Sequence, residues 1–251
     1  SNMWLPAIAT SLDALAVGAG LAFAGNTDIK HLIIDEGVWA IGEEAFICCT
    51  NLQSVRIPAS IEDIGWKIFG SCPNLKSITV DPANEEFDSR DNCNAIIETK
   101  SNTLVAGCGG SAIPSSVTTI GDAAFASCLN MESITIPDSV TEIMICAFRN
   151  CTSLKELKLS SNLKSIDNLA FENCTSLESI IVDDANTYYS SDNFGVLFNK
   201  DKTQLIQAPA VLTGNYEIPD GVAFISGSAF DDCNSLETIY FHSEAQKEKF
   251  E

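Results

Sequence analysis

The sequence has few histidines and few cationic side chains. Its two histidines, His31 and His242, lie near opposite ends of a 251-residue chain, so a multi-histidine metal centre within one chain is not expected. There are 14 Lys and Arg residues against 34 Asp and Glu, a net charge of −20. A field of that sign repels phosphate backbones and anionic lipid. We therefore expect no nucleic-acid partner.

The usual signatures of catalysis and cofactor binding are also missing. There is no G-x-S-x-G motif and no C-x-x-C pair, and the glycine-rich segment 107–110 lacks the lysine of a phosphate-binding loop. The paired carboxylates, such as Glu43-Glu44, are expected on turns that face water. We predict no catalytic residues, no bound metal and no cofactor, while the oxygen-rich loops around Asp88, Asp91 and Asp192 keep calcium as an alternative.

One block of residues recurs six times along the chain. In each copy an Ile is followed by a Phe, a Cys three residues later, an apolar residue three further on, and then an alternating apolar pair. The starting isoleucines Ile41 and Ile64 are 23 residues apart, as are Ile120, Ile143 and Ile166. The Phe and Cys pairs are Phe46 and Cys49, Phe69 and Cys72, Phe125 and Cys128, Phe148 and Cys151, Phe171 and Cys174, and Phe230 and Cys233.

This block predicts a solenoid. The alternating apolar pair indicates a short strand with one face inward, and the A-F-x-x-C-x-x-L spacing indicates a short helical or 3₁₀ turn. Each unit has an apolar side that only stacking can bury. We expect an α/β, right-handed solenoid in which the six Phe rings form one buried column. The six repeated cysteines are expected to be reduced, buried packing residues.

The repeated block resembles the repeat of a known protein family. The pattern I-G-x-x-A-F-x-x-C-x-x-L-x-x-I-x-I-P is similar to the leucine-rich repeats of the BspA type, also called the Treponema pallidum type, over roughly residues 29–251. Asp167 and Ile68 depart from it, where Gly and Ala are usual. The resemblance implies a leucine-rich repeat fold and a bacterial surface protein that takes part in adhesion.

Two related insertions, 81–113 and 183–217, interrupt the repeat. Asn84 with Phe87 parallels Asn186 with Tyr189. Each insertion has two apolar segments separated by a polar turn, which indicates a β-hairpin. The hairpins are expected to continue the stack as irregular rungs.

The chain divides into an N-terminal segment, 1–28, and a repeat domain, 29–251. Ser1-Asn2 is typical of an expression-tag remnant, and 3–24 is apolar enough for a membrane span, although no basic residue precedes it as in a signal peptide. Residues 7–23 resemble one helix of bacterial manganese efflux pumps, in which Asp13 would contribute to the metal path. One helix forms no transport pathway, so the segment is a fused segment or a cap on the solenoid. At the other end, Ser243 predicts the N-cap of a short helix.

The concave strand face is the expected binding surface, because side chains flanking the inner apolar position point outward. We predict a monomeric, non-catalytic interaction or adhesion module, on the cell surface or secreted, that binds host or bacterial surface proteins or glycans through this face and the hairpins. The alternatives are a repeat scaffold within a larger protein and an enzyme with an unrecognised site. The predicted binding residues are Arg56, Thr79, Thr135, Lys158, Ile181 and Tyr240.

Overall fold

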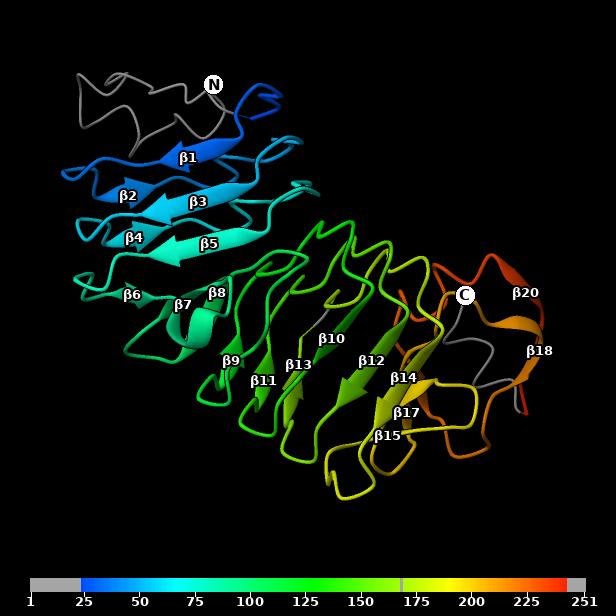
Figure 1. Cartoon of the computed structure of the whole chain (residues 1–251). Coiled ribbons are helices and arrows are strands. Elements are labelled where there is room, and N and C mark those ends of the chain that lie inside the picture. Colours follow the sequence, from blue (N-terminus) through cyan, green and yellow to red (C-terminus); the bar gives the residue numbers. More distant parts are fainter. Residues whose placement is uncertain (1–23, 168, 243–251) are drawn as a thin grey trace.

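The structure is a computed structural model that describes residues 24–167 and 169–242 (Figure 1). The expected N-terminal apolar helix, the pump-like segment with Asp13 and the expected helix after Ser243 lie outside these residues. None of the helical structure in the described residues is long and apolar enough to cross a membrane.

The chain coils into a stack of rungs, each with a longer strand on one side and a two-residue strand on another (Figure 1). The longer strands form what we call the long-strand face: β1 (His31–Ile33), β3 (Ser54–Ile57), β5 (Ser77–Val80), β10 (Ser133–Thr135), β12 (Glu156–Leu159), β14 (Ser179–Val182), β18 (Thr213–Glu217) and β20 (Ser235–Tyr240). The two-residue strands form the short-strand face: β2 (Ala40–Ile41), β4 (Asp63–Ile64), β9 (Thr119–Ile120), β11 (Glu142–Ile143), β13 (Ser165–Ile166) and β19 (Phe224–Ile225).

Neighbouring rungs pair in parallel at the interval of the sequence repeat. Ser54 of β3 lies opposite Ser77 of β5, and Glu156 of β12 lies opposite Ser179 of β14. Both pairs are separated by one 23-residue repeat. The leucine-rich repeat solenoid expected from the sequence is therefore confirmed.

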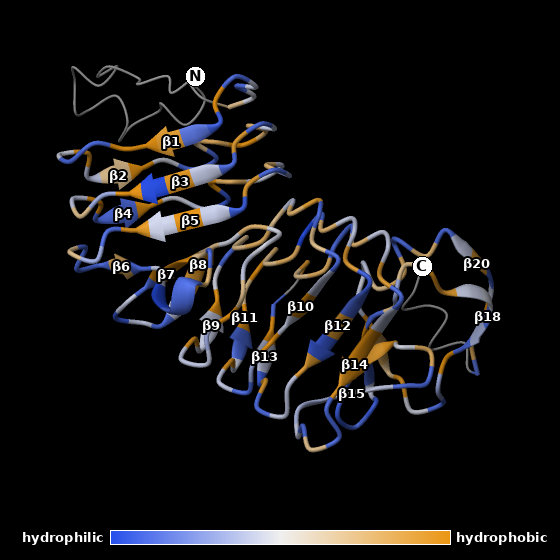
Figure 2. Cartoon of the chain, in the orientation of Figure 1, coloured by the Kyte–Doolittle hydropathy of each residue, from blue (hydrophilic) through white to orange (hydrophobic). Residues whose placement is uncertain are grey.

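Each long strand alternates between buried and accessible residues. In β3, Val55 and Ile57 are buried while Arg56 is exposed, and Figure 2 shows hydrophobic and hydrophilic residues alternating along these strands. The A-F-x-x-C segments are successive hydrogen-bonded turns, and the one helix of the described residues outside them is a 3₁₀ segment, Arg90–Asn92. Helix does not propagate through these turns because residues such as Cys48 and Ser127 take φ near +60° (59° and 61°), outside the right-handed helical region.

Both insertions contain the expected hairpins and pair with the short-strand face on one side only, because within the described residues neither β4 nor β13 pairs with the insertion that follows it. In each, the last hairpin strand pairs in parallel with the next two-residue strand, β8 with β9 and β17 with β19. The insertion strands are β6 (Phe87–Asp88), β7 (Ile96–Glu98) and β8 (Thr103–Ala106), then β15 (Tyr189–Ser191), β16 (Leu197–Asn199) and β17 (Gln204–Gln207).

A buried asparagine anchors each insertion to the preceding rung. The Asn186 amide nitrogen donates to the carbonyls of Ser160 (2.8 Å) and Leu163 (3.0 Å), and its oxygen accepts from the N–H groups of Tyr188 and Tyr189 (both 2.8 Å). Asn84 makes the same four bonds in the first insertion. All the bonding capacity of a buried amide is thus used to hold backbone.

Both insertions interrupt the long-strand face, but the first does not separate the turns on either side of it. Strands β1-β3-β5 and β10-β12-β14 form separate sheets, and β18-β20 forms a third. At the turns, however, Ser71 N–H donates directly to the Ser127 carbonyl (3.0 Å), which bypasses the first insertion. Extra residues on one side of the stack only must incline the rungs, and Figure 1 shows the second stack of long strands inclined to the first.

The expectation of one continuous Phe column is wrong. Phe46 stacks on Phe69, and Phe148 stacks between Phe125 and Phe171, but the stacks are separate. Gly107 of the first insertion occupies the Phe position of its rung, because its N–H donates to the next rung as the Phe N–H groups do. A Cβ there would lie 2.2 Å from the Phe125 ring, so only glycine allows that ring to pack.

The repeated cysteines are free thiols that bond to the rung before them. Cys151 Sγ donates to the carbonyl of Phe125 and Cys174 Sγ to that of Phe148 (both 3.2 Å), as Cys72 does to Phe46 (3.0 Å). Five of the six are buried and Cys233 is partly buried. Besides filling space, the thiol supplies a weak donor to a buried backbone carbonyl.

We expect these thiols to resist chemical modification in the folded protein. Burial raises the pKa of Cys72 to about 12 and that of Cys151 well above its ordinary value, so little reactive thiolate forms at pH 8. A disulfide-exchange reagent should label exposed Cys48 first and the buried thiols slowly. In denaturant without reductant all ten cysteines should react, and a lower count would contradict the free-thiol state.

Candidate binding surfaces

The residues predicted to bind a partner all lie exposed on the long-strand face. In the first sheet Arg56 of β3 lies beside Thr79 of β5. In the second, Thr135, Lys158 and Ile181 form one row across β10, β12 and β14. Tyr240 of β20 lies beside Glu217 in the third. The structure thus places the six residues as a pair, a row of three and a single residue, because each insertion breaks the sheet.

Three apolar or aromatic and two cationic side chains stand out on this face. Ile33 of β1 is 62% exposed, Ile181 42% and Tyr240 51%. Arg56 pairs with Asp81 (3.1 Å) and Lys158 with Glu156 (3.0 Å). Exposed ion pairs of this kind contribute little stability, so both cations can exchange their partners for those of a bound protein.

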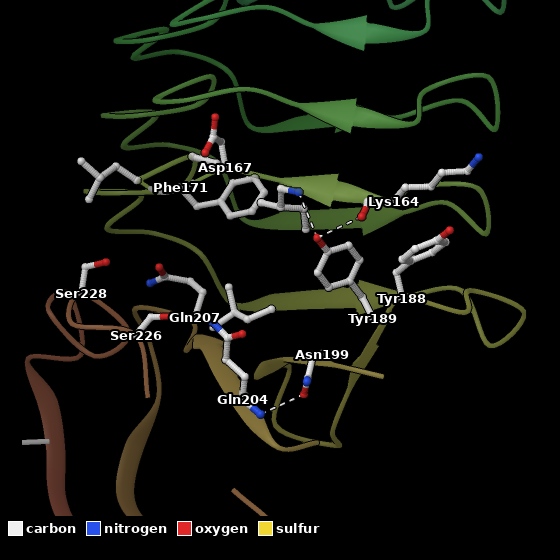
Figure 3. Close-up of a pocket in the computed structure, with 14 residues that line it drawn as sticks. Lys164, Asp167, Phe171, Tyr188, Tyr189, Asn199, Gln204, Gln207, Ser226 and Ser228 are labelled. Atoms are coloured by element: carbon white, nitrogen blue, oxygen red, sulfur yellow. Dashed lines mark hydrogen bonds between the residues drawn. The ribbon is translucent and has the colours of Figure 1, made fainter. Parts of the chain in front are cut away.

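A cavity of about 260 Å³ lies between the fifth repeat, the second insertion and β19. It forms where β13 and β17 do not pair and the short-strand face is interrupted. Figure 3 shows side chains from these elements around it. Its lining comprises Lys164, Ile166, Asp167, Leu169, Ala170, Phe171, Tyr188, Tyr189, Asn199, Gln204, Ile206, Gln207, Ser226 and Ser228.

Tyr189 spans the interruption. Its hydroxyl accepts from Ile166 N–H (3.0 Å) and donates to the Lys164 carbonyl (3.4 Å), as drawn in Figure 3. The Tyr189 hydroxyl therefore forms hydrogen bonds with backbone groups at the edge of β13, where a neighbouring strand is absent. Burial raises the pKa of Tyr189, which keeps the hydroxyl neutral.

Neither the cavity nor the oxygen-rich loops present a metal or acid–base centre. The cavity contains one carboxylate, Asp167, and no histidine or cysteine. Within 24–167 and 169–242, no group of three or more His, Cys, Asp or Glu is placed to hold a metal ion. Asp192 accepts hydrogen bonds from Phe194 N–H, Val196 N–H and Tyr216 hydroxyl, so this carboxylate shapes the insertion.

The cavity could not be located from the repeat pattern, because it depends on side chains from segments about 60 residues apart. The available signal was the contrast between the insertions, since Tyr189 and the two glutamines replace residues that are apolar or smaller in the first.

Comparisons with known proteins agree with the fold. A leucine-rich repeat protein from Eubacterium ventriosum superposes with a TM-score of 0.63 and 20% identity over 88% of this chain and 56% of its own. A leucine rich cell surface protein from Faecalibacterium prausnitzii gives a TM-score of 0.55 and 26% identity over 84% of this chain and 63% of its own. The chain thus spans about six tenths of these proteins. No curated protein matches it in sequence.

The family comparison covers most of the chain. The model of the BspA type leucine rich repeat region, in six copies, matches residues 19–101, 110–205 and 212–249. The repeat pattern, the parallel rungs and this match agree, and the chain belongs to the family of BspA-type leucine-rich repeat proteins.

Proposed function

We propose that the chain is a protein-interaction module of a bacterial surface protein and that its partner binds the long-strand face. The observation that carries this is the regular presentation of exposed side chains at alternate positions of parallel strands. Loops and sheets on a repeat scaffold commonly serve recognition. Family membership supports the same class, as does the similar Faecalibacterium protein described as a cell surface protein.

The partner should be an extended, basic or neutral protein surface. The net charge of −20 favours association with cations and repels acidic partners, and binding should weaken as salt screens this attraction. Tyr240 and Arg56 are the residue types that most often dominate interface energies.

We expect Tyr240→Ala and Arg56→Ala each to weaken binding at least about tenfold, the effect of a typical dominant interface residue. The partner would first be captured from host matrix proteins and bacterial surface fractions, and affinities would then be measured with purified components. Trp66→Ala is the control, because this exposed aromatic follows the short strand β4. A loss of affinity with the control alone would place the partner on another face.

A further inference from the structure

The two insertions share a scaffold but differ in chemistry at one place. Hairpin strands β8 and β17 occupy the same position, since Thr103 lies opposite Thr119 as Gln204 lies opposite Phe224. The residues of the first insertion and of the rung after it that match Tyr189, Gln204, Gln207, Ser226 and Ser228 are, in order, Phe87, Thr103, Ala106, Gly121 and Ala123. At these five positions the fold is built from small or apolar residues, whereas the positions of Tyr188 and Asn199 hold Glu86 and Glu98.

The scaffold does not require a polar side chain at the position of Gln207, since Ala106 holds that position in the first insertion. Gln207 is only 8% exposed, and burying an amide costs free energy unless its bonds are satisfied. Its nitrogen donates to the carbonyls of Ala208 (3.2 Å) and Ala229 (3.5 Å), but its oxygen accepts no hydrogen bond from the described residues. The side chain is nearly buried and lines the cavity, and an amide oxygen there that lacks a protein donor can accept a hydrogen bond from a ligand.

The lining specifies an uncharged ligand with many hydroxyl groups. The amide oxygens of Gln204 and Gln207 accept no hydrogen bond from the described residues, and the hydroxyls of Ser226 and Ser228 can both donate and accept. A hydroxyl group can meet either kind of partner, whereas an apolar ligand would leave the amides unpaired. One lysine and one aspartate balance each other, so an anionic ligand finds no excess of cations.

The volume of the cavity and its aromatic side chains narrow the class of ligand further. About 260 Å³ lies just below the range typical of drug-sized ligands, roughly 300–1,000 Å³, and suits a ligand of one or two rings. Phe171 and Tyr188 line the cavity; Phe171 is buried, and Tyr188, which is 48% exposed, provides ring surface for the C–H face of a sugar.

We propose that this cavity binds a neutral saccharide unit, such as the terminal sugar of a glycan. The site is on the short-strand side of the stack, separate from the long-strand face, so it does not rest on the function proposed above. Gln207 and Gln204 would bind the sugar hydroxyls, and Tyr189 would fix the cavity wall.

Saturation-transfer difference NMR tests this with the full chain and a panel of glucose, galactose, mannose, fucose, N-acetylglucosamine and N-acetylgalactosamine. We expect at least one sugar to bind and sialic acid, which is anionic, not to bind. Gln207→Ala and Gln204→Thr, which copy the first insertion, should each weaken binding about tenfold through the loss of a hydrogen bond. Thr103→Ala and Tyr240→Ala should leave it unchanged.

Thermal unfolding of each variant would establish that it is folded, and Gln204→Thr, at a half-exposed position, serves if Gln207→Ala does not fold. Absence of binding to every neutral sugar would overturn the proposal, as would binding that survives both glutamine substitutions. Capture of a peptide at this cavity, without any sugar, would also overturn it and would assign the cavity to a protein partner.

Discussion

Replacement of Asn186 by Ala is expected to lower the free energy of unfolding by about 3–5 kcal/mol. The change removes four hydrogen bonds from a side chain with no exposed surface. It leaves two buried carbonyls and two N–H groups without these partners, and an unsatisfied buried polar group costs about 1–3 kcal/mol. Urea unfolding of the variant and the parent chain measures the difference.

Asn162→Ala provides the control. Asn162 is exposed and its amide makes one bond, to the Asp138 carbonyl (2.9 Å), so its removal should cost less than about 1.5 kcal/mol. Asn84→Ala should resemble Asn186→Ala, because both side chains hold an insertion in the same way. Equal losses for Asn162 and Asn186 would show that the buried amide does not anchor the insertion.

Phe148→Ala should also cost about 3–5 kcal/mol, the usual range for a buried Phe. Its ring is fully buried and lies between Phe125, at a centroid distance of 5.3 Å, and Phe171, at 5.9 Å. Truncation therefore opens a cavity in the middle of a stack that neighbouring rungs can fill only partly. Chemical unfolding followed by circular dichroism gives the change.

Phe230→Ala tests whether position in the stack matters. Phe230 is only partly buried and packs in a tilted arrangement on Tyr216, 6.1 Å away, so its truncation should cost less than that of Phe148. If the two variants lose the same stability, the three-ring stack adds nothing beyond burial of a single ring.

The regular rungs could be predicted because one packing rule repeats along the chain. The 23-residue spacing between isoleucines fixes which strands pair, and the alternation in segments such as 54–57 fixes which side chains face inward. The outward position of Arg56 and Tyr240 followed from the same alternation. Whether these residues bind a partner does not follow from it.

The interruptions could not be predicted from the repeat alone. The sequence does not show that Gly107 takes the place of a repeat Phe, because its position depends on how the hairpin of the first insertion returns to the stack. The cavity beside Tyr189 depends on the failure of β13 and β17 to pair. Both features depend on how an irregular insertion folds back onto the stack, and the regular 23-residue pattern does not specify this.

The Ser71–Ser127 hydrogen bond keeps the turns in contact across the first insertion, and this affects how a longer array of repeats would curve. Where an insertion thickens one side of the stack while the turns remain in contact, it acts as a wedge. The interval from Ile64 to Ile166 equals that from Asn84 to Asn186, so the two wedges are placed at the same phase of the repeat. An array that continued this spacing would curve by a fixed step at each wedge, and the number of rungs between wedges would set its radius.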